Sequence, residues 1–176
     1  HHVMVDLETL GTGPNAVITS VGMVTFDPVS LVRIAKFQTG LNIQSQIDDG
    51  RTITAGTLAW WANQERFSDQ FWSELSSNFD TAAEIAGFIG SDNCVWGNGA
   101  GFDNVILGSF LRDYGVPDKD LWKHWNDRCF RTFVKLFDPD KTLRPRSNDH
   151  DALRDAENQV QWMFNIISDR GLQSMF

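Results

Sequence analysis

The sequence has little of several features that mark specialised classes of protein. It holds 2 cysteines in 176 residues, and no apolar run approaches the roughly 18 residues of a membrane-spanning helix. Cys94 and Cys129 are too few for a secreted disulfide scaffold and lack the spacing of a zinc finger. The N-terminus has no signal-peptide pattern, and His1 and His2 fit either a tag remnant or native strand residues. These absences predict a reduced, cytoplasmic protein with no membrane partner.

Basic residues are also scarce. The 15 Lys and Arg face 23 Asp and Glu, so the formal net charge is −8, which by itself argues against a polyanionic partner. The charge is uneven, because residues 123–146 hold seven basic and three acidic side chains and therefore carry +4. A positive stretch on an acidic body is compatible with nucleic acid, although most such runs are solvated faces.

The composition that is present fits one globular domain. Hydrophobic residues make up 41% and charged residues 22%, which is ordinary for a chain with a single core. The length suits one domain better than two, so we expect a single domain over residues 1–176.

Hydrophobic patterning predicts a mixed α/β domain that begins with strands. Residues 3–5, 17–26 and 31–41 are rich in apolar and β-branched side chains and are separated by turn signals, which favours an antiparallel meander. The polar stretch 43–53 is predicted to be a loop. Residues 95–96 form a further short, buried strand candidate.

Helical spacing dominates the remainder of the chain. Thr81 and Glu84 fit a capping box, and Asn148 or Asp149 is the expected cap of the last helix. The predicted helices cover residues 58–75, 81–89, 102–114, 130–137 and 150–169.

Two carboxylates follow the first apolar strand. Asp6 and Glu8 lie two residues apart, so both side chains leave the same face of a strand. Two unpaired charges are costly to bury, so the pair must be neutralised or solvated. A bare D-x-E of this kind is more often a pair of surface acids.

Further acids and a histidine stand where helices begin. Asp103 follows the glycine-rich turn 97–101, where it is either a ligand or an acid that interacts with the helix dipole. His150 and Asp155 open the last helix, where each taken alone would fit a surface residue. Together with Asp6 and Glu8 they occupy the element ends at which α/β folds expose working groups.

Oxygen-rich donor sets of this kind suit Mg²⁺ or Mn²⁺ better than Zn²⁺. Two such ions about 3.5–4 Å apart can clamp the oxygens of a phosphoryl displacement. Histidine titrates near neutral pH and can accept the proton of an attacking water. The pattern therefore predicts metal-assisted hydrolysis of a phosphate ester.

Three motifs carry a family resemblance. D-L-E-T at residues 6–9, W-G-N-G-A-G-F-D-N at 96–104 and H-D-A-L-R-D-A at 150–156 resemble the exonuclease motifs of the DEDDh, or DnaQ-like, 3′–5′ exonucleases. The resemblance implies an RNase H-like fold, a mixed five-stranded β-sheet flanked by α-helices. It also implies two Mg²⁺ or Mn²⁺ ions bound by four ligands and a general base, which would be Asp6, Glu8, Asp103, Asp155 and, as the base, His150. The only tyrosine is Tyr114, outside these motifs, which excludes the sister DEDDy group.

Further segments are similar to one branch of that family, the DexA exonuclease of T-even phages and its bacterial exoribonuclease relatives. They are E-T-L-G-T-G-P-N-A at residues 8–16, W-W-x-x-Q at 60–64 and R-C-F-R-T at 128–132. The resemblance extends from residue 3 to about residue 167. It departs from the wider group at residues 98–103, where N-G-A-G-F-D replaces H-N-A-x-F-D, so the substrate contact of Asn98 is less safely transferred.

The resemblance also suggests where the substrate lies. Thr9 and Leu10 would contact the terminal 3′-OH and ribose, and an aromatic side chain could stack on a base without reading sequence. For the tryptophans, core packing is the alternative, and Arg128 and Arg131 would bind the phosphate backbone or hold structural ion pairs, with the structural role favoured for Arg131. The remaining substrate-binding candidates are Trp60, Trp61, Gln64, Asn98 and Phe102.

These observations predict a 3′–5′ exonuclease that hydrolyses phosphodiester bonds of single-stranded DNA or RNA from the 3′ end and releases nucleoside 5′-monophosphates. The alternatives are an exoribonuclease for short RNA oligomers, a catalytically silent module that binds nucleic-acid ends, and a phosphodiesterase acting on dinucleotides. A homodimer is compatible with the sequence, and no residue demonstrates it.

Overall fold

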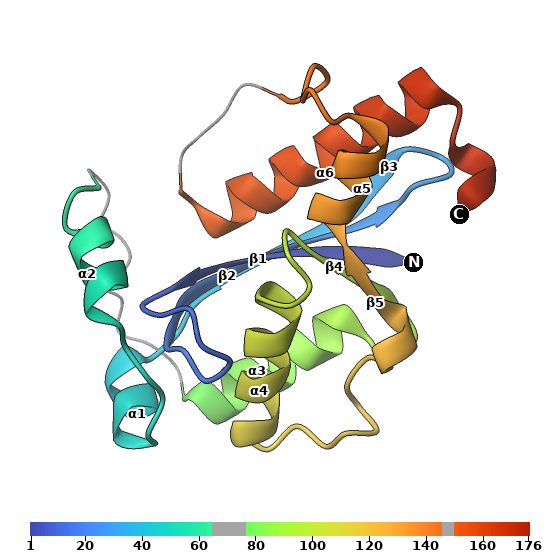
Figure 1. Ribbon diagram of the computed structural model, residues 1–176. Coiled ribbons are helices and arrows are strands. Elements are labelled where there is room, and N and C mark those ends of the chain that lie inside the picture. The colour runs from blue at the N-terminus through green and yellow to red at the C-terminus, as the bar shows by residue number, and fades with distance from the viewer. Residues whose placement is uncertain (65–76, 146–149) are drawn as a thin grey trace.

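The fold is built on a mixed β-sheet at the centre of the molecule. The computed structural model describes residues 1–64, 77–145 and 150–176 (Figure 1). The sheet has five strands in the order β3-β2-β1-β4-β5, which confirms the predicted architecture. The strands are β1 (His2–Thr9), β2 (Ile18–Asp27), β3 (Val32–Gly40), β4 (Cys94–Gly97) and β5 (Asp127–Cys129).

The first three strands form the predicted antiparallel meander, and the last two are parallel to β1. Because β4 and β5 run in the same direction as β1, their carboxyl ends meet at the end of β1 that carries the acidic pair. Short turns and helices then place the following residues around that edge. The topology thus collects segments that are far apart in the sequence.

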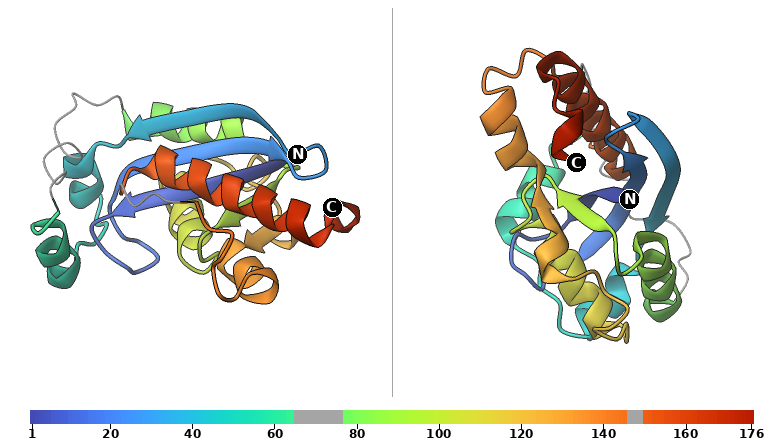
Figure 2. Two further views of the ribbon diagram at one scale, coloured as in Figure 1. Left: turned by 90° about the horizontal axis from the view of Figure 1, so that it is seen from above. Right: turned by 90° about the vertical axis from the view of Figure 1, so that its right-hand side faces the viewer.

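Helices cover both faces of the sheet. In Figure 1, α5 and α6 lie above the sheet, and α3 and α4 lie below it. In Figure 2, α6 extends across β1 and β2 in the view from above. The helices are α1 (Ile43–Asp48), α2 (Ala55–Trp61), α3 (Asn78–Ile89), α4 (Asp103–Asp113), α5 (Phe130–Phe137) and α6 (Ala152–Arg170), with short 3₁₀ turns at His124–Asn126 and Gln173–Met175.

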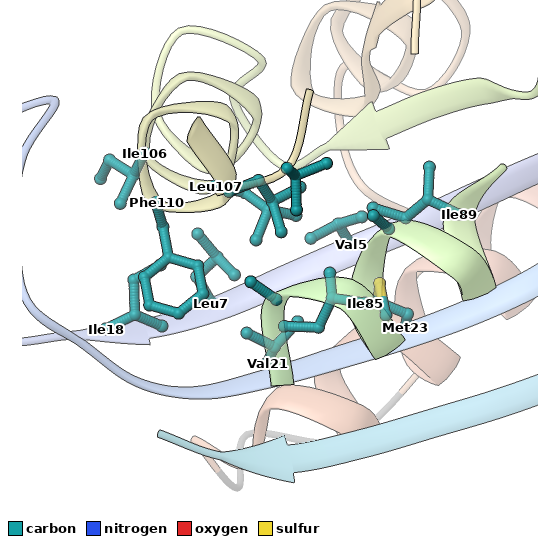
Figure 3. Close-up of a cluster of buried hydrophobic side chains, with 14 of the residues drawn as sticks. Val5, Leu7, Ile18, Val21, Met23, Ile85, Ile89, Ile106, Leu107 and Phe110 are labelled. Atoms are coloured by element: carbon teal, nitrogen blue, oxygen red, sulfur yellow. The ribbon is translucent and has the colours of Figure 1, made fainter. Parts of the chain in front are cut away.

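The alternation of β1 divides its side chains between two cores. Val5 and Leu7 pack with α3 and α4 in the cluster of Figure 3, whereas Met4 packs with α5 and α6. Asp6 and Glu8 share the face of Met4, because side chains two apart point the same way. The acidic pair therefore faces α6, which carries the third motif.

The predicted loop at residues 43–53 is wrong in its first half, which is helix α1. Asn42 caps this helix by accepting a hydrogen bond from the backbone of Ser45 at 3.0 Å. Gln46 is buried, and its amide pairs with both the N–H and the C=O of Ile18. The polar sequence did not predict this helix, because Gln46 is buried only through the two hydrogen bonds of its amide with the backbone of Ile18.

Two helix starts also differ from the prediction. Helix α3 begins at Asn78 behind the cap Ser77, and Thr81 is buried inside it, so the capping box was wrongly placed. Helix α6 begins at Ala152 and is capped by Asp151, whose carboxylate accepts a hydrogen bond from the backbone of Arg154.

The remaining helix predictions have different outcomes. Asn148 and Asp149, the expected caps of the last helix, lie outside the described residues. The predicted helix at 58–75 overlaps α2, and its part from residue 65 onward is outside them as well. The helices predicted at 102–114 and 130–137 are confirmed by α4 and α5.

Gly22 sets how closely α6 approaches the sheet. A Cβ at this position would lie 2.1 Å from the backbone carbon of Ala152, and Gly22 pairs with Asp6 across β1 and β2. The start of α6 therefore sits directly over the acidic strand, and a backbone contact cannot move as a side-chain tip could.

We expect Gly22→Ala to lower the stability by about 3 kcal/mol, or roughly 10 °C in Tm, because the helix must shift. Gly87→Ala is the matched control, since a Cβ there meets nothing within 4 Å in a helix. Thermal unfolding of both variants tests this. Equal Tm values would mean that α6 does not depend on this contact.

Candidate active site

A pocket of about 280 Å³ opens where β1, the turn after β4 and the first half of α6 meet. A larger groove, of about 580 Å³, lies between α3 and the segment that follows α4, residues 114–120, and holds none of the predicted site residues. The chemistry therefore belongs to the smaller pocket. Its lining residues are Asp6, Glu8, Asn98, Phe130, Arg144, Pro145, His150, Asp155, Asn158, Gln159 and Trp162.

Four of the five predicted catalytic residues, Asp6, Glu8, His150 and Asp155, line this pocket, and they come from β1, the segment before α6 and α6 itself. One ligand atom each of Glu8, His150 and Asp155 lies within 4.8 Å of the others. Asp6 accepts a 2.6 Å hydrogen bond from the amide of Gln159 on α6. Asp103 is buried at the start of α4, and its charge raises the pKa of both acids of β1.

The carboxylates are costly to ionise together. Burial, followed by the charges of Asp103, Glu8 and Asp155, raises the pKa of Asp6 well above its usual range. Burial and the neighbouring acids raise the pKa of Glu8 to about 8, and burial raises the pKa of Asp103 to about 7. A divalent cation would remove this penalty, and a set of carboxylate oxygens is what Mg²⁺ and Mn²⁺ prefer. The donor set therefore fits the predicted metal ions.

These shifts predict how the stability of the metal-free protein depends on pH. Glu8 has an ordinary pKa of 4.5 and a folded pKa of about 8, so the folded state holds more protons than the unfolded state between these values. Stability must therefore fall as pH rises through this window. In EDTA we expect Tm to drop by roughly 5 °C or more between pH 5 and pH 8, and Mg²⁺ or Mn²⁺ to restore it most at pH 8. A flat Tm over this range would contradict the account.

Glycines in the turn after β4 permit the close approach of Asp103. A Cβ on Gly97 would lie 2.4 Å from Oδ1 of Asn104 and 2.9 Å from Cβ of Asp103. Gly99 has φ 142°, which favours glycine. The absence of side chains at these glycines therefore allows the first residues of α4 to pack closely against β4.

The two predicted arginines differ in their surroundings. Arg128 donates to the backbone carbonyls of Trp125 and Asp127 at 2.7 and 2.9 Å, which is a structural role. The guanidinium carbon of Arg131 lies 3.9 Å from a Cβ built on Gly99, and its charge lowers the pKa of Asp103. Arg131 is therefore the arginine of this pair that lies beside the acidic cluster.

The adjacent tryptophans of α2 have separate roles. Trp61 is buried, and its Nε1 donates to the carbonyl of Thr9 at 2.9 Å, which ties α2 to the end of β1. Trp60 is 43% exposed, and its ring centroid lies 4.9 Å from that of His150 at an interplanar angle of 89°. The core-packing alternative thus describes Trp61, whereas Trp60 lies beside the predicted base.

The other substrate candidates surround the pocket unevenly. Asn98 lines it, and Phe102 is half-buried against the core below α4. Leu10 packs with Trp61 in a small apolar cluster, and the hydroxyl of Thr9 donates to a backbone carbonyl. Gln64 donates to a backbone carbonyl of α2. Contacts of all these residues with substrate stay predictions.

Sequence reasoning missed six of the lining residues, and the contacts of two of them, Gln159 and Arg144, bear on the chemistry. Gln159 lies four residues after Asp155, so helical periodicity could have placed both on one face of α6. Its Nε2 holds Asp6, and its buried Oε1 has no hydrogen-bond partner among the described atoms. Arg144 lies between helices, and no local pattern distinguishes it from the other basic residues of its segment.

Comparisons with known proteins find nucleases. A model of the 3′–5′ exoribonuclease Rv2179c-like domain matches residues 1–167. An exodeoxyribonuclease of Enterobacteria phage T4 is 26% identical over 196 residues, covering 91% of this chain and 86% of that protein. No helix in the described ranges is both long and apolar enough to cross a membrane.

Solved structures of E. coli exonuclease I share the fold. The zinc-bound form of its complex with single-stranded DNA matches 99% of this chain with a TM-score of 0.70 at 15% identity. Its complex with a dT13 oligonucleotide matches with a TM-score of 0.67 at 16% identity. In both, the chain spans 42% of the length of exonuclease I. The likeness confirms the RNase H-like fold.

Proposed function

The chain belongs to the 3′–5′ exoribonuclease Rv2179c-like domain family and is a 3′–5′ exonuclease, and from this premise we propose how its pocket acts. It hydrolyses phosphodiester bonds of single-stranded DNA or RNA from the 3′ end and releases nucleoside 5′-monophosphates. The observation that carries the proposal is the convergence of Asp6, Glu8 and Asp155 with His150 on one pocket. The single-stranded DNA in the exonuclease I structures supports the choice of substrate.

Four carboxylates would hold two Mg²⁺ or Mn²⁺ ions. Asp6, Glu8 and Asp155 line the pocket, and Asp103 is buried at the start of α4. When bound, such ions polarise the scissile phosphate and lower the pKa of water. The carboxylates fix the ions, and the amide of Gln159 fixes Asp6. The zinc-bound form of exonuclease I supports a metal requirement without identifying the ions used here.

His150 would act as the general base. An imidazole nitrogen accepts a proton from the attacking water while the water oxygen bonds to phosphorus. The bond from phosphorus to the 3′ oxygen of the preceding nucleotide breaks, and that oxygen takes a proton from solvent water and leaves as a hydroxyl, while the imidazolium returns its own proton to solvent. The products are a nucleoside 5′-monophosphate and a strand one nucleotide shorter.

The 3′ nucleotide would lie between the carboxylates and the exposed ring of Trp60. Trp60 can stack on a base, which tolerates any sequence. Thr9, Leu10, Asn98 and Phe102 remain candidates for its ribose and base. Arg131 suits the phosphate backbone because it lies beside the acidic cluster.

Matched 5′-labelled DNA, RNA and dinucleotide substrates test the function. We expect a ladder of strands shortened from the 3′ end, with nucleoside 5′-monophosphates as products, in Mg²⁺ or Mn²⁺ only. The family description favours RNA, whereas the phage relative is described as an exodeoxyribonuclease, so both sugars must be compared. Binding of 3′ ends with no shortening of any substrate would instead indicate a silent binding module.

A single domain over residues 1–176 and a homodimer are also part of the proposal. The domain is supported by one sheet that organises both cores. The homodimer follows from the sequence resemblance alone. Light scattering of the purified chain would distinguish monomer from dimer.

A further inference from the structure

One cation lines the acidic pocket beside Trp162 of α6. Among the lining residues that the structure describes, Arg144 is the one permanently charged base. Its guanidinium carbon lies 5.5 Å from the centroid of the Trp162 ring, over the face of that ring. Arg144 comes from the connection between α5 and α6, so neither metal-ligand motif includes it.

The connection that carries Arg144 is fastened to α6. The buried carboxylate of Asp138 accepts hydrogen bonds from Nε1 of Trp162 at 2.7 Å and from the backbone of Thr142 and Leu143 at 3.0 and 3.1 Å. Nδ2 of Asn165 donates to the carbonyl of Leu143 at 2.9 Å. These contacts fix the backbone beside Arg144 and the ring beneath it, so the guanidinium is pre-organised.

The length of the pocket determines which phosphate of a bound strand Arg144 can contact. Asp155 and Trp162 both line it from α6, and a helix rises 1.5 Å per residue, so they lie about 10 Å apart along the axis. Gln159, whose amide holds Asp6, lies three residues before Trp162, or about 4.5 Å along the axis. A scissile phosphate held between Asp6 and Asp155 is therefore about one to two helical turns from the ring under the guanidinium. A neighbouring phosphate of the same strand can reach the guanidinium.

We propose that Arg144 binds the phosphate next to the scissile one, on its 5′ side, and so positions the strand along α6. The inference rests on the proposed function. A planar guanidinium can donate two parallel hydrogen bonds to phosphate oxygens, and stacking on Trp162 leaves its N–H edge available for them. Such a contact is independent of base identity, as an exonuclease that shortens any sequence requires.

A substrate with one neutral methylphosphonate linkage tests the position of the contact. With the linkage next to the scissile bond on its 5′ side, KM of the native enzyme should rise by about 10- to 100-fold, the range for losing a charge-assisted hydrogen bond. The same linkage placed several nucleotides upstream is the control and should change KM little.

Substitution of Arg144, combined with the neutral linkage in the substrate, forms a double-mutant cycle. Arg144→Gln should raise KM for the unmodified strand by a similar factor, keep kcat within about threefold and be insensitive to the neutral linkage. Arg144→Lys should recover part of the loss, because it keeps the charge without the planar fork. Lys135→Gln, an exposed change of the same charge on α5, should leave KM unchanged.

Two results would overturn the proposal. One is an unchanged KM in Arg144→Gln, and the other is a full methylphosphonate effect that persists in Arg144→Gln. Either can occur while the native enzyme still shortens unmodified strands in a metal-dependent manner. The failure of this inference is therefore distinguishable from a failure of the proposed function.

Discussion

Replacing Asp6 with asparagine is expected to reduce kcat/KM by at least about 10³-fold and, in the same molecule, to make the metal-free protein more stable. The catalytic loss follows from removing a metal-binding carboxylate. The gain in stability follows from removing a carboxylate whose ionisation is opposed first by burial and then by the charges of Asp103, Glu8 and Asp155. The asparagine oxygen can still accept the hydrogen bond from Gln159, so the packing is retained.

Nuclease assays and thermal unfolding in EDTA measure the two effects together. At pH 8 we expect Tm of Asp6→Asn to exceed that of the native protein by roughly 5 °C. Addition of Mn²⁺ should raise the Tm of the native protein more than that of the variant. Asp140→Asn, at an exposed position, is the control and should change neither quantity. Native-like activity in Asp6→Asn would remove this residue from the metal site.

Replacing His150 is expected to have the second-largest effect, a loss of about 10²- to 10⁴-fold in kcat with metal affinity retained. An imidazole that accepts the proton of water is required for turnover and not for holding the ions. His150→Ala and His150→Asn should agree. Asparagine is the conservative choice, because the backbone φ of 46° lies in the left-handed region that asparagine tolerates.

The close approach of His150 to Glu8 and Asp155 makes its role testable in a second way. If the imidazole were a metal ligand, both variants would bind Mn²⁺ more weakly, and excess Mn²⁺ would restore part of the rate. The proposal requires instead that saturating Mn²⁺ leaves the rate loss unchanged. Trp60→Leu is a useful companion, because it removes the ring beside the imidazole and leaves every carboxylate in place.

Much of the site was predictable because its residues occur in short, ordered motifs. D-L-E at the end of a strand fixes two carboxylates on one face by the two-residue period alone. Helical spacing predicts in the same way that Asp155 lies in the first turn of α6. The convergence of these segments could be expected because parallel strands bring their carboxyl ends to one edge of the sheet.

The features that sequence reasoning missed depend on contacts between distant segments. Gln46 is a polar residue in a polar stretch, and only its pairing with Ile18 makes it part of a buried helix. Ser77 and Thr81 have the same capping chemistry, and tertiary packing decides which one ends up buried. Arg144 reaches the pocket only because Asp138 fastens the α5–α6 connection to α6.

The folded structure also changes how the net negative charge bears on the binding of nucleic acid. A net charge of −8 argues against a polyanionic partner when it is read from composition alone. Several of these charges are gathered around one pocket, where burial first, and for Asp6 and Glu8 also the neighbouring acids, raises their pKa values. Metal binding would remove much of the cost of ionising these acids together, so weak affinity for nucleic acid without metal is expected.

A calorimetric titration of the metal-free protein with Mn²⁺ tests the central claim most directly. We predict two bound ions per chain in the native protein, and a loss of at least one of them, or a marked weakening of both, in Asp6→Asn. Identical titrations of the two proteins, or binding that persists unchanged without Asp6, would contradict the account.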